Sequence, residues 1–335
     1  MSMAKVLITG GAGFIGAHLA FQLAKRGDII TVVDDFNNRY DPALKEARVT
    51  ALLQTLDNQP TVIRADIRNA ALIDQLCQKE RFDSVVHLAA WAAVQTSIER
   101  PHIYSQVNLD GTVNVLEAAR KTGVKNIVFA SSSSVYGGRS KVPFRETDDV
   151  SRPISPYAAT KAAGEILCAA WHHLYNLPIT CLRFFTVYGP WGRPEMALFK
   201  FATAIYRNQP VLMRGKKTMR DFTYIDDCIA GITAALDTPM GFEIFNLGES
   251  DAVSLPRFIA AIEASLGRQA RIEEVPLPPG DVPKTLADIS KAQSKLGYAP
   301  ATAIEDGVNK FSGWFTNWYV PVYLKINSDS DSSYS

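Results

Sequence analysis

A tyrosine and a lysine four residues apart are the side chains best suited to proton chemistry. Tyr157 and Lys161 lie in Y-A-A-T-K at the start of a predicted helix, so the phenol and the ammonium share one helix face. A free tyrosine has a pKa of about 10 and is a poor base at neutral pH unless a nearby cation favours the phenolate. With Lys161 as that cation, the pair predicts Tyr157 as a general base.

A run of four serines precedes this pair. It spans 131–134 in A-S-S-S-S-V-Y-G, directly after a predicted strand at 126–130. Ligands of open parallel α/β sheets bind at the carboxyl ends of the strands, so we expect these hydroxyls at the site. Capping the strand end is an equally good role for any single serine of the run.

Three glycines near the N-terminus predict a dinucleotide site. Gly10, Gly13 and Gly16 form G-G-A-G-F-I-G between a predicted strand at 5–9 and a predicted helix at 15–25. This arrangement allows a tight turn, a close backbone approach to a diphosphate and close packing of helix on strand, while the helix N-terminus offers N–H donors. The alternative is a tight turn that binds no ligand.

Two aspartates follow the next predicted strands. Asp34 comes eighteen residues after Gly16, where an acidic side chain binds an adenosine ribose 2′-hydroxyl. A carboxylate there repels a 2′-phosphate and no arginine follows it immediately, so the sequence favours NAD over NADP. Asp66 is placed to accept from the adenine amine or, alternatively, to cap a helix at 69–78.

The elements that must position these residues alternate from residue 4 to about 183. This pattern predicts an α/β fold, a Rossmann-type doubly wound parallel sheet. The predicted strands are 5–9, 29–33, 61–65, 84–87, 126–130 and 179–183, and the helices between them include 15–25, 69–78, 98–121 and 157–174.

After residue 183 the sequence changes to loops rich in proline, glycine and tryptophan. Shorter helices are predicted at 197–206, 227–236, 255–265 and 304–318. We therefore expect an NAD-binding domain over 1–183 and a smaller α/β substrate-binding domain over 184–320, from which a strand or helix can return to the first. Residues 327–335 have nothing to bury and are predicted to be a disordered tail.

Composition excludes several classes of protein. The 335 residues are 47% hydrophobic and 21% charged, which is typical of globular chains, and the formal net charge of +1 provides no general field for nucleic acid or anionic lipid. The four cysteines form no C-x-x-C pair, so neither disulfides nor a metal site is expected. Without a signal peptide or a long apolar segment, the sequence predicts a cytoplasmic protein.

The motifs, in this order and spacing, resemble the extended short-chain dehydrogenase/reductase family over residues 4–315. H-L-A-A at 87–90 is part of the resemblance. L-R-F-F-T-V-Y-G-P-W-G-R-P-E-M-A-L-F-K-F at 182–201 and R-D-F-T-Y-I-D-D at 220–227 are similar to NAD-dependent nucleotide-sugar 4-epimerases, most closely those acting on UDP-glucuronate.

The resemblance implies roles for further residues. Ser132 would touch the sugar 4-hydroxyl as a catalytic residue beside Tyr157 and Lys161, and Arg193 and Arg220 would face the UDP diphosphate and ribose. Besides the three glycines, Asp34 and Asp66, the implied cofactor-binding residues are Phe14, Ile15, Ile67, Leu88, Ala89, Ala90, Tyr157 and Lys161. The implied substrate-binding residues are Ser132, Ser133, Ser134, Thr186, Arg193, Met196, Phe199 and Arg220.

The residue types within this resemblance favour epimerisation. Related dehydratases carry an Asp-Glu pair where this chain has Ser133 and Ser134, and related decarboxylases keep a glutamate at the second position. Without those carboxyls, the implied reaction is hydride removal at C4, rotation of the 4-keto sugar and hydride return, which converts UDP-glucuronate to UDP-galacturonate. Ser133, Ser134 and Thr186 would hold the substrate carboxylate.

One departure from the family pattern keeps alternatives open. A-A-V-Q-T-S places Gln95 and Thr96 where an arginine and a tyrosine are usual, so a cation near the substrate is lost. A 4-epimerase of UDP-glucose, UDP-galactose or their N-acetylated forms therefore remains an alternative. A non-catalytic NAD-binding regulator is a second one, although it would be expected to have lost Tyr157 or Lys161. The family also implies a homodimer that pairs the helices at 98–121 and 157–174.

Overall fold

A computed structural model describes residues 3–324 and is built around a parallel sheet. Within these residues the sheet has seven strands in the order β10-β6-β5-β4-β1-β2-β3, and all neighbours are parallel. The predicted Rossmann-type doubly wound fold is thereby confirmed. The strands are β1 (Lys5–Thr9), β2 (Ile29–Asp34), β3 (Thr61–Arg64), β4 (Ser84–His87), β5 (Asn126–Ser132), β6 (Ile179–Phe184) and β10 (Phe242–Leu247).

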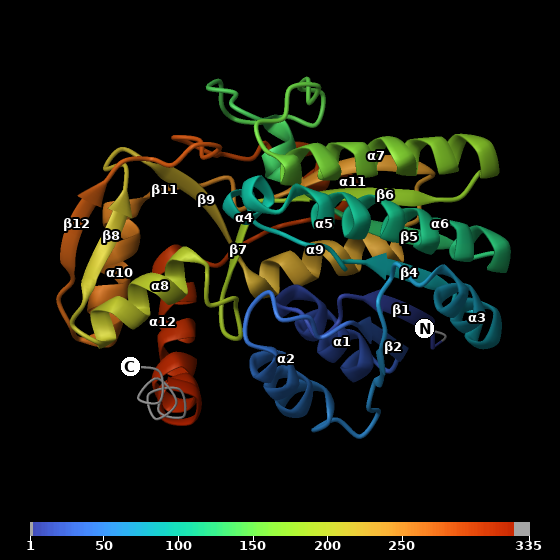
Figure 1. The fold of residues 1–335 in the computed structure, drawn as a ribbon, viewed down its shortest axis with the longest axis horizontal. Coiled ribbons are helices and arrows are strands. Elements are labelled where there is room, and N and C mark those ends of the chain that lie inside the picture. The colour runs from blue at the N-terminus through green and yellow to red at the C-terminus, as the bar shows by residue number, and fades with distance from the viewer. Residues whose placement is uncertain (1–2, 325–335) are drawn as a thin grey trace.

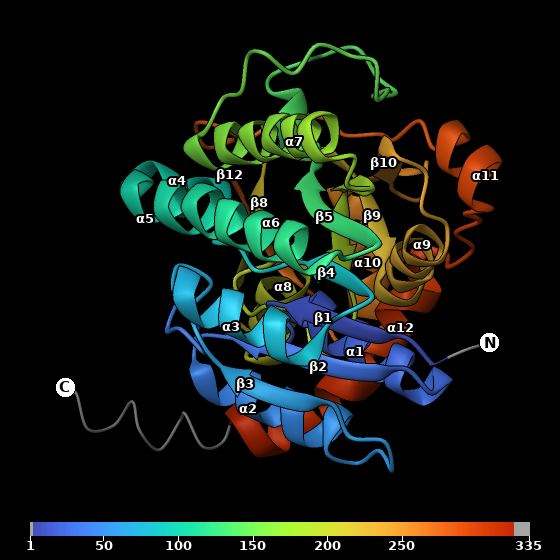
Figure 2. The same ribbon diagram turned by 90° about the vertical axis from the view of Figure 1, so that its right-hand side faces the viewer.

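Helices cover both faces of this sheet (Figures 1 and 2). One face packs against α1 (Phe14–Arg26) and α9 (Ile225–Asp237), and the other against α3 (Ala70–Glu80), α6 (Gly111–Thr122) and α7 (Pro156–Tyr175). Successive strand residues point to opposite faces. Val32 accordingly belongs to the core cluster on the α1 side and Val33 to the cluster on the α3 side. Double burial explains the nearly continuous apolar sequence of the central strands.

The helix predicted over 98–121 is wrong as one element. The segment forms α4 (Val94–Glu99), α5 (Pro101–Ser105), a π-helical turn (Gln106–Asp110) and α6. The break lies at Arg100, whose φ of −132° and ψ of 57° are not helical. Arg100 precedes Pro101, and the proline ring disfavours helical geometry in the residue before it.

A short helix in the first domain escaped prediction. It is α2 (Pro42–Arg48), which continues as a π-helical turn over Val49–Leu53. Asp41 caps it by accepting a hydrogen bond from the Ala43 N–H at 2.9 Å, and Pro42 occupies the first position, where its missing N–H costs nothing. This cap is the local signal that was available in the sequence.

The later part of the chain forms a second unit beside the carboxyl ends of the central strands (Figure 1). Its strands are β7 (Thr186–Tyr188), β8 (Pro210–Arg214), β9 (Met219–Tyr224), β11 (Ala252–Ser254) and β12 (Arg271–Val275), and its helices include α8 (Ala197–Tyr206), α10 (Leu255–Leu266), α11 (Ser290–Leu296), α12 (Ile304–Trp314) and a π-helical segment (Phe315–Leu324). Three elements of this region return to the central sheet: β10 joins it, α9 packs on it, and α11 packs against β10 and α9. The tail predicted at 327–335 lies outside the described residues.

The cysteines and the helices bear on two of the expectations from composition. All four cysteines are free and buried. No helix within residues 3–324 is both long enough and apolar enough to cross a bilayer.

Candidate active site

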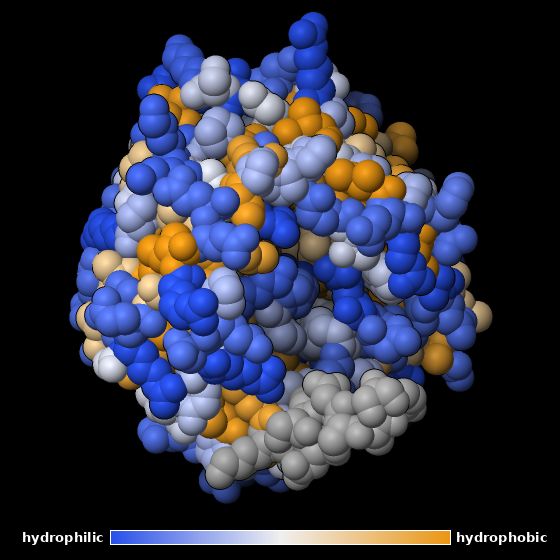
Figure 3. All heavy atoms as spheres, turned by 60° about the vertical axis from the view of Figure 1, so that its left-hand side comes forward, coloured by the Kyte–Doolittle hydropathy of each residue, from blue (hydrophilic) through white to orange (hydrophobic). Residues whose placement is uncertain are grey.

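A cavity of about 370 Å³ lies where the carboxyl ends of the central strands meet the second unit. Parallel α/β sheets bind ligands there, next to the point where the strand order reverses, which in this sheet lies between β1 and β4. A space-filling view from the side of the second unit shows a hollowed surface with a mostly hydrophilic rim (Figure 3). The cavity is lined by Gly10, Gly13, Phe14, Ile15, Gly16, Asp34, Asp66, Ile67, Leu88, Ala89, Ala90, Ser132, Ser133, Ser134, Tyr157, Lys161, Thr186, Arg193 and Met196, all predicted from the sequence.

The glycine turn at one end of this cavity is too close-packed for other residues. Gly10 has a φ of +73°, and a Cβ there would lie 2.7 Å from the Ala89 nitrogen. A Cβ on Gly16 would lie 2.3 Å from the Gly10 carbonyl oxygen. No side chain caps the N-terminus of α1, which follows Gly13. The bare backbone and free N–H groups fit a dinucleotide diphosphate.

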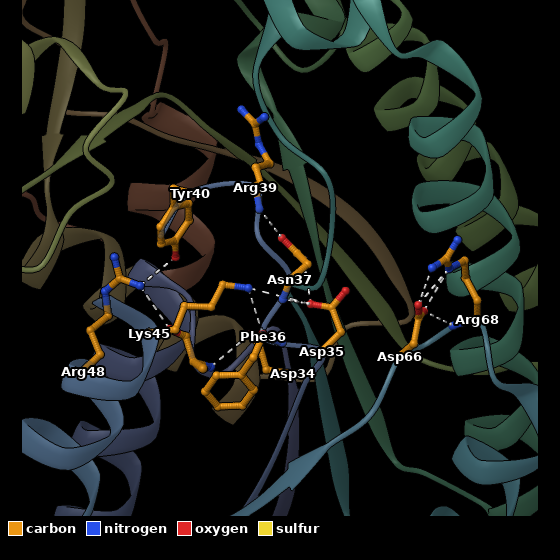
Figure 4. Close-up of polar contacts among 11 residues, drawn as sticks. Asp34, Asp35, Phe36, Asn37, Arg39, Tyr40, Lys45, Arg48, Asp66 and Arg68 are labelled. Atoms are coloured by element: carbon orange, nitrogen blue, oxygen red, sulfur yellow. Dashed lines mark hydrogen bonds and ion pairs between the residues drawn. The ribbon is translucent and has the colours of Figure 1, made fainter. Parts of the chain in front are cut away.

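Asp34 lies at the end of β2 in this cavity, with internal partners for both of its oxygens. Its Oδ2 accepts from the Ala12 N–H at 3.2 Å, and its Oδ1 accepts from the Phe36 N–H at 2.9 Å. Oδ1 also accepts from the Lys45 ammonium at 3.0 Å, which lies 3.7 Å from Asp35 (Figure 4). This cation was not predicted from the sequence, because it lies within α2, eleven residues after Asp34, rather than immediately after it. Two carboxylates outweigh one ammonium, so the position still disfavours a 2′-phosphate.

Asp66 lies at the edge of the same cavity and binds Arg68. The Arg68 Nε donates to Asp66 Oδ2 at 2.9 Å, and this pairing lowers the pKa of Asp66 (Figure 4). The alternative role of Asp66 as a cap for α3 is wrong. Asn69 caps that helix instead, by accepting from the Leu72 N–H at 3.1 Å.

Tyr157 lies in the first turn of α7, where Ser155 caps the helix by accepting from the Ala158 N–H at 3.1 Å. Burial raises the pKa of Tyr157, and the Ser132 hydroxyl and the charges of Arg193 and Arg39 lower it. Both of these arginines line the cavity.

Lys161 lies one turn further along α7, with its ammonium directed to the sheet. Nζ donates to the Ala130 carbonyl at 2.7 Å, and burial lowers the pKa of Lys161 to about 8, against the raising effects of Cys168 and Glu165. Lys161 is not among the groups that shift Tyr157 in this geometry. Its predicted effect on the phenol therefore stays a prediction.

The serine run divides between two roles. Ser131, which also lines the cavity, donates to Glu165 Oε1 at 2.5 Å. Ser132 accepts from the Ser134 N–H at 3.2 Å and so caps the short 3₁₀ turn Ser133–Tyr136, and its hydroxyl also lies within hydrogen-bond distance of Ser134 Oγ. Ser132 therefore both caps this turn and lines the cavity.

Two predicted substrate residues lie outside the lining of this cavity. Arg220 donates to the Met219 carbonyl at 3.0 Å, and burial lowers its pKa. Phe199 packs edge-on against Phe311 and Trp314 in the core, with ring centroids 4.9 and 5.6 Å away. Contact of either residue with a substrate stays a prediction.

Gln95 also points away from the cavity, because its Nε2 donates to the Pro279 carbonyl at 2.8 Å. Although Gln95 stands where an arginine is usual, the cavity lining still contains positive charge. Arg39 and Arg193 both line the cavity, and both reach Glu195 Oε1, at 3.5 and 3.4 Å. Arg39, which comes from the loop between β2 and α2, was not predicted from the sequence.

Comparison with known proteins agrees with this geometry. The model of the NAD-dependent epimerase/dehydratase family matches residues 6–248. UDP-glucuronate 4-epimerase 1 of Arabidopsis thaliana is 43% identical over 333 residues, covering 94% of this chain and 77% of the plant protein. The crystal structure of UDP-glucuronic acid 4-epimerase from Bacillus cereus, in complex with UDP-glucuronic acid and NAD, has a TM-score of 0.87 and 35% identity, covering 94% of this chain and 100% of its own. UDP-glucose 4-epimerase from Thermotoga maritima, with UDP-glucose, has a TM-score of 0.85 and 29% identity over 93% of this chain and 98% of its own.

Proposed function

Because the chain belongs to the NAD-dependent epimerase/dehydratase family and is an NAD-dependent UDP-sugar 4-epimerase, we propose that it converts UDP-glucuronate to UDP-galacturonate. One observation carries the choice of substrate. The wall of the cavity near Tyr157 presents hydroxyls and two guanidiniums, which share the single partner Glu195 outside the lining. The carboxylates among the described lining residues are Asp34 and Asp35, at and after the end of β2, and Asp66, after β3. This wall suits an anionic sugar and lacks an acid for dehydration.

We propose the following roles for the side chains in the reaction. The Tyr157 phenolate takes the proton of the 4-hydroxyl, while Ser132 donates a hydrogen bond to the same oxygen. NAD, when bound, supplies the acceptor for the C4 hydride and its return. The resulting 4-keto sugar rotates, so that the hydride returns to the opposite face of C4. Tyr157 then gives the proton back to the C4 oxygen.

An epimerase of a uronate must also prevent loss of CO2. The 4-keto intermediate is a β-keto acid, which decarboxylates when the carboxylate turns perpendicular to the carbonyl plane. Hydroxyls donate strong hydrogen bonds to a carboxylate, and Ser133, Ser134 and Thr186 line the cavity on the side of Tyr157. We propose that they hold the carboxylate in plane.

Thr186→Val tests this role. The change removes one hydroxyl at nearly constant volume, so we expect the epimerisation rate to fall about tenfold, the size of one hydrogen bond to a charged group, and the UDP-pentose by-product to rise. Product chromatography measures both. Thr223→Val is the matched control, because Thr223 Oγ1 is buried without a hydrogen-bond partner among the described residues. Unchanged by-product in Thr186→Val would show that Thr186 does not hold the carboxylate.

Substrate preference tests the function itself. UDP-glucuronate and UDP-glucose are supplied in parallel to the purified protein, and kcat/KM is measured for each with product identification by NMR. We expect UDP-glucuronate to have the higher kcat/KM by at least an order of magnitude. UDP-glucose lacks the carboxylate, and loss of a hydrogen-bonded charge costs about that factor. Faster turnover of UDP-glucose would establish the alternative function.

Asp34→Asn tests the adenosine end. We expect the variant to purify with much less NAD than the wild type, because an amide accepts fewer hydrogen bonds than a carboxylate and leaves Lys45 without its buried counter-charge. The amount of NAD released on denaturation is measured by absorbance and chromatography. Asp57→Asn, at an exposed position, should carry the wild-type amount. Equal NAD in Asp34→Asn would remove Asp34 from the cofactor site.

We also propose a homodimer formed through α7 and the α4–α6 segment. These helices lie over the same face of the sheet (Figure 2), and Ile166 and Leu174 on α7 are 69% and 64% exposed. A second copy of the chain packed along α7 would cover both of these apolar side chains. The molar mass from light scattering distinguishes one chain from two.

A further inference from the structure

Arg48, the last residue of α2, is a fully buried cation with partners in three separate segments. Its Nη1 donates to the Ala12 carbonyl at 3.1 Å, inside the glycine turn, and to the Tyr40 hydroxyl at 2.7 Å. Its Nε donates to the Trp191 carbonyl at 2.7 Å, and its Nη2 donates to the Gly192 carbonyl at 3.1 Å. One guanidinium therefore joins the predicted cofactor turn to a loop of the second unit. Its hydrogen bond to Tyr40 is drawn in Figure 4.

No carboxylate among residues 3–324 lies within ion-pair distance of this guanidinium. A buried cation is costly, and proteins usually pair it with a carboxylate. Arg183 in the same chain follows that rule, with Glu165 at 2.7 Å. Arg48 instead donates to the carbonyl oxygens of Ala12, Trp191 and Gly192. Because the guanidinium is planar and rigid, these hydrogen bonds hold the backbone segments at a set separation.

The loop that Arg48 holds carries a residue of the candidate site. Gly192 is adjacent to Arg193, which lines the cavity. Trp191 has a φ of +62°, in the left-handed region that non-glycine residues rarely adopt, so the surrounding contacts must maintain this conformation. These contacts are the Arg48 hydrogen bond and the rings of Trp314 and Trp318, whose centroids lie 5.0 and 4.2 Å from that of Trp191.

A second contact joins the segment around α2 to the 191–195 loop. Arg39, nine residues before Arg48, lies 3.5 Å from Glu195, two residues beyond Arg193. The segment from Arg39 to Arg48 therefore contacts the 191–195 loop on both sides of Arg193. Arg193 also lies 3.4 Å from Glu195 within the same loop, so both the guanidinium and its local partner are carried by the backbone that Arg48 binds.

We propose that Arg48 is a positioning residue for substrate binding, which sets the 191–195 loop so that the Arg193 guanidinium meets the anionic diphosphate of the nucleotide sugar. This role rests on the proposed function, in which Arg193 contacts the UDP part. Arg48 itself does not line the cavity and acts through Arg193.

A double-mutant cycle on UDP binding tests the role, with UDP as the titrant and calorimetry as the readout at matched NAD content. We expect Arg48→Met and Arg193→Ala each to weaken binding about tenfold, and the double variant to bind no more weakly than the weaker single variant. Effects that multiply in the double variant would overturn the positioning role. Wild-type binding by Arg48→Met beside weakened Arg193→Ala would overturn it as well, whereas wild-type binding by Arg193→Ala would overturn both this role and the proposed contact with UDP.

Two further variants separate positioning from folding. Arg48→Lys keeps the charge, but one ammonium cannot bond the Ala12, Trp191 and Gly192 carbonyls together, so UDP binding should stay weakened while the thermal unfolding midpoint largely recovers. Arg64→Met is the matched control, since Arg64 is exposed and pairs with Glu46 on the same helix α2 at 2.5 Å. Its UDP affinity should equal that of the wild type. Wild-type UDP binding by Arg48→Lys would show that only the charge matters and would overturn the proposal.

Discussion

Tyr157→Phe lowers kcat by about two to four orders of magnitude, the contribution typical of a positioned general base. The phenyl ring keeps the packing of the phenol, including the edge contact with Tyr104 at 6.2 Å between centroids. The substitution therefore removes the proton acceptor for the 4-hydroxyl without disturbing the cavity. Steady-state rates give the loss, and UDP titration should show unchanged binding, because in the proposed reaction Tyr157 acts on the sugar and not on the nucleotide.

A second tyrosine on the same helix serves as the control for this experiment. Tyr175 ends α7 at the surface, and Tyr175→Phe should keep the wild-type rate. If Tyr157→Phe retained more than about a tenth of the activity, a loss far below that of a general base, the base would have to be another residue.

Lys161→Met causes a loss of comparable size. Lys161 is a buried ammonium one turn from Tyr157, and its removal takes a positive charge from the cofactor side of the cavity. A lost cation destabilises the phenolate, which raises the pKa of Tyr157 further. Activity that requires the phenolate should then need a higher pH, so the rising limb of the pH profile of kcat/KM should move toward alkaline pH.

The same pH profile identifies which cation acts on the phenol. The structure assigns lowering effects on Tyr157 to Arg193 and Arg39, while the Lys161 ammonium donates to Ala130. A rising limb that does not move in Lys161→Met would leave the stabilisation of the phenolate to the two arginines. Burial lowers the pKa of Lys161 to about 8, so its charge is lost as the pH rises above that value, and any contribution of this ammonium to the phenolate is lost with it.

The cofactor end of the site could be predicted because its signals are local. The glycine turn follows β1 directly, Asp34 ends β2 and Leu88 follows β4, so the parallel strands alone bring these residues to one edge of the sheet. Hydrophobic runs locate the strands, and a parallel arrangement aligns their carboxyl ends. Predicting this end of the site therefore requires no knowledge of contacts between distant segments.

The residues that escaped prediction depend on distant contacts. Arg48 gains its role from the Trp191 and Gly192 carbonyls, more than a hundred residues away, and nothing near Arg48 in the sequence indicates them. The direction of Gln95 likewise depends on Pro279 in the second unit. Phe199 lies in a motif with a predicted substrate role, yet core packing against Phe311 determines its position.

The most direct measurement follows a deuterium label at C4. UDP-glucuronate deuterated at C4 is incubated with the purified protein in ordinary water, and the product is examined by NMR and mass spectrometry. We predict UDP-galacturonate that keeps the deuterium at C4, because the hydride removed from C4 returns to the other face of the same carbon while Tyr157 exchanges only the hydroxyl proton. Loss of the label to water, or a UDP-pentose as the main product, would contradict the proposed epimerisation.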